Sequence, residues 1–172
     1  MAEAFSYQPD QDLIDRIAGL APGSTTYTVR HQRDKVAAAT QGSYEALFAP
    51  DLQGLSLQER LAVALHACAL TPAPELAAHY RERLQATGAD AALLASAESG
   101  QAAEPRLAAM LEFTRKLISK PVEGDQAAIQ ALPAAGLSTP AVVALSQLIA
   151  FLSYQVRLVA GLKAMKALEA AA

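Results

Sequence analysis

Glu75 and His79 are the two residues whose types and spacing best suit proton-transfer chemistry. They stand four positions apart near the expected start of a helix, so their side chains share one helical face. A carboxylate and an imidazole in this arrangement can act as an acid/base pair. The same spacing occurs on ordinary helices, where a first-turn glutamate interacts with the helix dipole and a histidine lies in a polar interface. The sequence leaves both interpretations open.

His66 is the third residue of this candidate site. A helical hairpin that turns near Pro72 and Ala73 would bring His66 and His79 to about the same height, because they are nearly equidistant from the turn. If both face inward, His66, Glu75 and His79 converge as a proton-transfer cluster or as a metal site of two histidines and one carboxylate. Nothing in the spacing requires a metal, and a satisfied core histidine is the common alternative. We therefore predict catalytic roles for the three residues, with no metal and no cofactor.

Cys68 is the single cysteine of the chain and an outside candidate for catalysis. One thiol can form neither an internal disulfide nor a Cys-x-x-Cys dithiol, and a cysteine-poor chain is typical of a reducing cytoplasm. A one-cysteine peroxidase would need a thiol with a lowered pKa and access to solvent. An apolar helix interior provides neither, so the sequence favours a buried, inert thiol.

The helical hairpin that carries these residues is well marked in the sequence. Ser56 to Glu59 forms a capping box, in which the serine and the glutamate side chains satisfy backbone amides at a helix start. The following residues 61–70 are apolar nearly all round, which is typical of a buried central helix. Pro72 and Pro74 end this helix and open the next one, expected over 75–85.

The remaining elements are also expected to be helical, because no segment alternates with period two. We predict one all-α domain over residues 1–172, with an N-terminal helical extension (1–50) and a core (51–172). Asp10 is expected to cap the first short helix. The loosest stretch is expected at 87–103, with at most one short helix. The other predicted helices span 24–48, 104–120, a short segment after Asp125, and 138–168.

Composition excludes several classes of function. The 172 residues carry 14 Lys and Arg against 17 Asp and Glu, spread along the chain, so no basic surface for nucleic acid is expected. The start of the chain lacks the pattern of a signal peptide. The apolar run 141–156 is shorter than the ~20 residues that span a bilayer, so no membrane association is predicted. A mean hydropathy of +0.17 suggests surplus apolar surface, and hence a homo-oligomer.

Two longer stretches carry a family resemblance. They are SLQERLAVALHACALTPAPELAAHY at 56–80 and RLAAMLEFTRKLISKPVEGDQAAIQALPAAGLSTPAVVALSQLIAFLSYQVRLVAGL at 106–162. In collinear order they resemble the alkylhydroperoxidase D-like (AhpD-like), or carboxymuconolactone decarboxylase-like (CMD), superfamily, and more narrowly a peroxidase-related subgroup of CMD domain proteins. The resemblance covers residues 48–165. It implies an AhpD-like helical bundle with a central buried hairpin and an association with antioxidant oxidoreductases.

The residues that the resemblance assigns to catalysis are mostly replaced in this chain. In the peroxidase branch the reaction uses a Cys-x-x-Cys pair, a histidine four residues after the second cysteine, and a glutamate on the preceding helix. The histidine matches His79, whereas the cysteine positions hold Pro72 and Glu75 and the glutamate position holds Arg60, with Glu59 beside it. The resemblance therefore implies a relative in which the dithiol cycle does not operate.

Three functions then remain open from the sequence. The first is acid/base chemistry on, or binding of, a small organic acid or lactone around Glu75, His79 and His66, as in the decarboxylase branch. The second is a non-catalytic subunit that pairs with a dithiol-bearing relative. The third is a one-cysteine peroxidase that uses Cys68.

Overall fold

The structure, a computed structural model, describes residues 7–171. Helices make up 76% of it, and the described residues contain no strand, which confirms the predicted all-α class. The chain forms two compact units. One comprises the residues up to 47 together with those from 157 onwards, and the other is Phe48–Val156. The second unit begins close to the predicted start of the core at 51, but the last part of the chain groups with the N-terminal segment.

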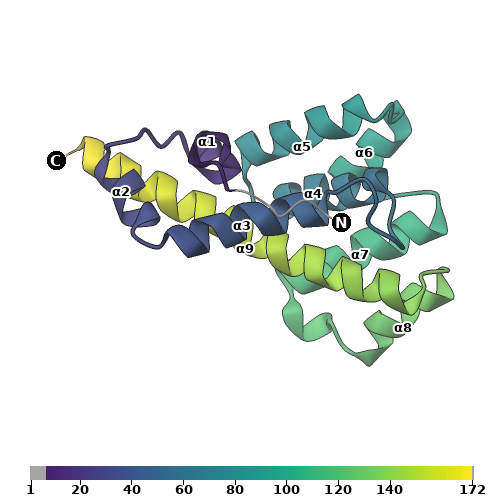
Figure 1. Cartoon of the computed structure of the whole chain (residues 1–172). Helices are drawn as coiled ribbons and strands as arrows, with labels where there is room; N and C mark the ends of the chain where they lie inside the picture. Colours follow the sequence, from purple (N-terminus) through teal and green to yellow (C-terminus); the bar gives the residue numbers. More distant parts are fainter. Residues whose placement is uncertain (1–6, 172) are drawn as a thin grey trace. The chain divides into compact units, whose positions relative to one another are not determined.

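The second unit is built around helix α4 (Leu57–Leu70). This helix packs against α5 (Pro74–Ala86), α6 (Ala91–Ser99) and α7 (Pro105–Ser119) (Figure 1). Helix α7 in turn packs against the 3-10 turn η2 (Pro121–Glu123) and α8 (Gln126–Ala134). Because α4 has neighbours on several sides, every residue from Arg60 to Cys68 is buried. The prediction of a central buried helix is thus confirmed.

Side-chain caps fix where the helices of this unit begin. The Ser56 hydroxyl accepts from the Glu59 amide at 3.2 Å, and Glu59 Oε2 accepts from the Ser56 amide at 2.6 Å, so the predicted capping box is present. Asp125 caps α8 as predicted. Asp90 caps α6 in the same way, and this nine-residue helix occupies much of the stretch that the sequence indicated as loosest. The sequence allowed for one short helix in this stretch, and α6 is that helix, with an aspartate at its N-cap.

The first unit contains η1 (Pro9–Gln11), α1 (Leu13–Ala18), α2 (Thr25–His31) and α3 (Asp34–Leu47). The prediction that Asp10 caps the first helix is wrong, because Asp12 accepts from the Asp15 amide and Asp10 lies within η1. Ser24 caps α2, but the single helix expected over 24–48 is divided between α2 and α3.

Helix α9 (Thr139–Ala170) is the longest element. Its residues up to Val156 belong to the second unit and the rest to the first. By length and composition alone, α9 is the one helix within residues 7–171 that could cross a membrane, and 39% of its most apolar window is buried. A core helix of a soluble protein passes the same test, so this property does not assign α9 to a membrane.

Candidate functional site

Helix α5 carries Glu75 and His79 on its first two turns. Pro74 occupies the first turn, where a missing amide hydrogen costs nothing, and the N-cap residue Ala73 provides no side-chain cap. Glu75 is exposed and His79 is half-buried, with its ring 5.2 Å from that of the following Tyr80 in an edge-on contact. The carboxylate and the imidazole therefore stand at a solvent-accessible helix start, one turn apart.

Tyr80 anchors this face of α5 to the interior of the second unit. Its side chain is fully buried, and its hydroxyl donates to Gln155 Oε1 at 2.6 Å. The ring also lies 5.3 Å from the ring of Phe48, over which the Arg83 guanidinium is placed at 5.2 Å. These contacts fix the orientation of α5, and with it the direction of the neighbouring His79.

His66 lies on α4 with only 5% of its surface exposed, and residues of α6 and α7 lie close to it. The Ala97 backbone on α6 and the charge of Glu112 on α7 act to raise the pKa of His66, and the charge of Arg115 on α7 acts to lower it. Gly100 is so close that a Cβ added there would clash with the imidazole carbon Cε1. Burial lowers the pKa of His66 below its ordinary value of 6.5, so the neutral imidazole is favoured.

These positions bear on the predicted convergence of His66, Glu75 and His79. The residues found near His66 belong to α6 and α7 or directly follow α6, whereas Glu75 and His79 lie on α5. Among residues 7–171, no group of three or more His, Cys, Asp or Glu side chains is arranged to hold a metal ion. The alternative of a two-histidine, one-carboxylate metal site therefore has no geometric basis in the described chain.

Cys68 is buried in α4 with 2% of its surface exposed. Burial raises the pKa of its thiol to about 12. A peroxide is attacked by the thiolate and not by the thiol, so this environment suppresses the reaction.

The residues at the position where the resemblance places a glutamate have structural partners. Arg60 is fully buried, and its guanidinium donates to the carbonyls of Ala49 and Ser56 at 2.8 and 3.2 Å. Glu59 uses one carboxylate oxygen in the capping box and the other to accept from Arg106 Nε at 2.6 Å. Glu59 is thus held at the start of α4.

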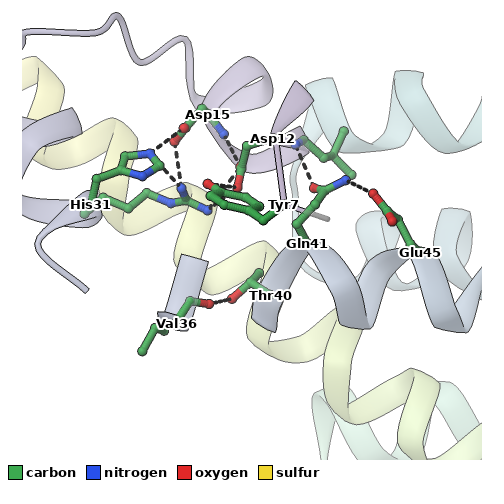
Figure 2. Close-up of polar contacts among 10 residues, drawn as sticks. Tyr7, Asp12, Asp15, His31, Val36, Thr40, Gln41 and Glu45 are labelled. Atoms are coloured by element: carbon green, nitrogen blue, oxygen red, sulfur yellow. Dashed lines mark hydrogen bonds and ion pairs between the residues drawn. The ribbon is translucent and has the colours of Figure 1, made fainter. Parts of the chain in front are cut away.

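A buried polar network in the first unit was not predicted from the sequence. Arg30 Nη2 donates to both oxygens of Asp12 at 3.1 Å, and Tyr7 donates to Asp12 Oδ2 at 3.0 Å. Figure 2 shows Asp15 and His31 beside them, with His31 Nε2 2.7 Å from Asp15 Oδ2. Asp12 and Asp15 also line a cavity of about 540 Å³. This is a second carboxylate–histidine pair in the chain.

The electrostatics of this network favour a structural role. Burial raises the pKa of Asp15 above its ordinary 3.8, against the lowering effects of the hydrogen bond with His31 and the charge of Arg30. Burial and the neighbouring Asp12 raise the pKa of Tyr7 to about 12. Each charge has an opposite charge beside it, as buried ions require. The only local signal in the sequence was a pair of aspartates three residues apart, which is too common to be informative.

Comparison of the chain with models of known protein families found no match, and no curated protein matches it either. The function is therefore inferred from the residues and their geometry, together with the resemblance described for 48–165.

Proposed function

We propose that this chain is an AhpD-like protein of the CMD superfamily that has no dithiol chemistry and uses Glu75 and His79 to bind, or transfer protons on, a small organic acid or lactone. The observation that carries the proposal is the contrast between Cys68 and this pair. Burial raises the pKa of the only thiol to about 12, whereas the carboxylate and the imidazole lie at an accessible helix start.

The start of α5 supports a substrate that carries a carboxylate or carbonyl oxygen. The N-cap residue Ala73 gives no side-chain cap, so the amides of the first turn are not satisfied by a capping side chain. Helix N-termini favour negative charge, and an oxygen that develops charge during proton transfer benefits from the same amides. His79, one turn further on, would act as the acid/base group, and Glu75 would assist it or hold the substrate.

The test of this site is proton exchange at the carbon next to a carbonyl group. The purified protein is incubated in D₂O with a panel of small organic acids and lactones, and deuterium incorporation is followed by NMR. We expect exchange with at least one compound, and a loss of about 10²-fold or more in Glu75→Gln and His79→Gln, as for removal of a general acid/base group. The exposed Glu82→Gln serves as the matched control on the same helix. Unchanged binding and exchange in both site variants would overturn the proposal.

A second measurement separates this proposal from peroxidase activity. Thiol-dependent consumption of an organic hydroperoxide is compared in the wild-type protein and Cys68→Ser. Because the buried thiol is protonated at neutral pH, we expect no turnover in either protein. Turnover that disappears in Cys68→Ser would establish a one-cysteine mechanism and contradict our assignment.

The first half of α9 favours a second candidate, a non-catalytic subunit that pairs with a dithiol-bearing relative. Residues 139–156 include no charged side chain. Val143 and Tyr154 are 51% and 43% exposed, and Gln147 and Ala150 between them are also exposed. These four residues repeat at intervals of four, three and four, which places them on one helical face. An uncharged face of this kind is typical of a subunit contact.

Native mass spectrometry and co-purification distinguish the two candidates. A stable mixed oligomer with a dithiol-bearing relative would support the subunit function. A self-sufficient homo-oligomer that carries out the exchange reaction would support the site at Glu75 and His79. In either case we expect Tyr154→Glu to weaken assembly, because it places a charge in the uncharged face.

A further inference from the structure

The second unit contains a cavity of about 340 Å³ at the end of α4 remote from the α4–α5 turn. It is formed where the first turns of α4, α6 and α7 lie together, and α4 packs against both of the other helices (Figure 1). Its volume is within the range of ~300–1,000 Å³ that is usual for small-molecule sites. None of its lining residues belongs to the proposed site at Glu75 and His79.

The walls of this cavity are mostly apolar. Leu107 of α7 is buried and Leu93 of α6 is half-buried, and both line the cavity. Ala92, Ala102 and Ala103 complete the apolar lining. A ligand would therefore bury a hydrocarbon body here, with the favourable free energy of removing apolar surface from water.

The polar groups at the edge of the cavity are acidic. Glu59, Asp90 and Glu104 all line it, and none of the lining residues that the structure describes is basic. Glu59 is neutralised by Arg106, which also donates to the carbonyls of Gly54 and Gly136. Within residues 7–171 no Lys, Arg or His side chain pairs with Asp90 or Glu104, so the lining residues carry a net negative charge.

The hydrogen bonds of these side chains show what a ligand would have to supply. Asp90 accepts from the Leu93 amide through Oδ1, and Glu104 accepts from the amides of Arg106 and Leu107. Asp90 is exposed, and its other oxygen, Oδ2, takes no part in the bond to the Leu93 amide. Gln58 donates its amide N–H to the Thr87 carbonyl, so its oxygen is available as an acceptor. Acceptors therefore predominate among these side chains, and a complementary ligand carries donors.

We propose that this cavity binds a small amphipathic cation, an aliphatic or aromatic primary amine. Its hydrocarbon body lies against Leu93 and Leu107, and its ammonium group donates to Asp90, with Gln58 as a further acceptor. A carboxylic acid of the same size is disfavoured, because the capping carboxylates of α6 and α7 already occupy the amides that would attract an anion. This site is separate from the one at Glu75 and His79 and does not depend on its function.

The charge of the ligand is tested with three probes of nearly equal size. Binding of n-hexylamine, 1-hexanol and hexanoate to the full chain is measured by two-dimensional NMR at neutral pH. We expect n-hexylamine to bind most tightly and hexanoate most weakly, with shifts in the amides of residues 90–96, 104, 106 and 107. The affinity for the amine should fall as salt is added, since salt screens exposed charges. Hexanoate binding as tightly as the amine, or no saturable shift with the amine, would overturn the proposal.

The location of the site is tested with variants that keep the helix caps. Asparagine is as good an N-cap as aspartate, so Asp90→Asn removes the charge and keeps α6. We expect its affinity for n-hexylamine to fall roughly threefold to fivefold, as for a partly exposed ion pair. The matched control is Asp125→Asn, which makes the same change at the cap of α8, away from the cavity.

A second variant, Ser96→Leu, fills the cavity from α6 and leaves both carboxylates in place. It should abolish the shifts caused by n-hexylamine, with helicity unchanged in circular dichroism. Equal losses of affinity in Asp90→Asn and Asp125→Asn would show binding to surface charge in general. Unchanged binding in Ser96→Leu would show that the amine lies elsewhere. Either result would overturn the assignment of the cavity.

Discussion

Cys68 and His66 lie two residues apart on α4, and burial holds both in their neutral forms. It raises the pKa of the thiol and lowers that of the imidazole, because a low-dielectric environment disfavours whichever form is charged. His66 Nδ1 has no hydrogen-bond partner among the described residues. A proton added at that nitrogen would be a buried charge without an acceptor. The buried environment of His66 and Cys68 is therefore unsuited to ionic chemistry.

At the residue scale, we predict that His66 makes the protein sensitive to acid. The pKa of His66 is lower in the folded chain than its ordinary value of 6.5. As the pH falls below about 6.5, His66 therefore binds a proton more readily in the unfolded chain than in the folded chain. Stability is then full above about pH 6.5 and decreases as the pH falls toward the lowered pKa. Facing charges come from Glu112 and Arg115 on α7. Urea unfolding of wild type and His66→Phe at about pH 7.5 and about pH 5 measures the effect.

The variant should lose less stability than the wild type between these two conditions. His79→Gln serves as the control, since that side chain is half-buried and lies on α5. The same acid-induced loss in wild type and His66→Phe would show that His66 is not the group responsible.

At the scale of the elements, Arg106 joins three segments of the second unit. Its guanidinium donates to Glu59 at the start of α4, to the Gly54 carbonyl before α4, and to the Gly136 carbonyl before α9. The partners lie 47, 52 and 30 positions away in the sequence. One planar side chain with donors in fixed directions serves all three, which a lysine cannot do.

We predict that Arg106→Lys lowers the free energy of unfolding by about 1–3 kcal/mol, the usual cost of losing hydrogen bonds between charged and polar groups. The side chain is 27% exposed, so the lower part of that range is expected. The control is Arg81→Lys, because the Arg81–Glu98 pair is largely exposed and exposed pairs contribute about 0–1 kcal/mol. Chemical denaturation measures both variants. Equal effects in Arg106→Lys and Arg81→Lys would show that the three-way contact is not a stabilising one.

The same elements show what could be predicted from the sequence. The capping box at Ser56, the cap at Asp125 and the all-α class depend on neighbouring residues, and each was predicted correctly. The bonds of Arg106 and the network of Asp12 and Arg30 join positions far apart, and no local rule indicates them. The cap of α1 was assigned to Asp10 because two aspartates compete there, and only backbone geometry distinguishes them.

In the candidate site, too, the features that depend on neighbouring residues could be predicted, and those that depend on distant residues could not. Glu75 and His79 could be placed at the start of α5 because proline and the hairpin turn are local signals. The environment of His66 could not be predicted, because it depends on which helices cover α4. Gly100, which lies against the imidazole, ends a helix that the sequence indicated only weakly.

At the scale of the whole molecule, the chain returns at its C-terminus to complete the first unit. Glu169 accepts hydrogen bonds from the amides of Thr25 and Thr26 and from the Thr26 hydroxyl, at 2.6 to 3.1 Å. These bonds lower the pKa of Glu169 to about 2. Lys166 donates to the Gly19 carbonyl at 2.7 Å. The N-terminal end of α2 is thus satisfied by a carboxylate more than 140 positions away, in addition to its own cap at Ser24.

We predict that Glu169→Gln loosens the first unit and leaves the second unchanged. The amide side chain keeps one acceptor oxygen but loses the charge that favours a helix N-terminus. Hydrogen exchange followed by mass spectrometry should then be faster in peptides from α1 and α2, and unchanged in peptides from α4 and α7. Glu98→Gln, in the exposed pair of α6, is the control and should alter neither set. Faster exchange of α4 in Glu169→Gln would show that the two units unfold as one cooperative body, whereas an effect confined to α1 and α2 would show that each has its own stability.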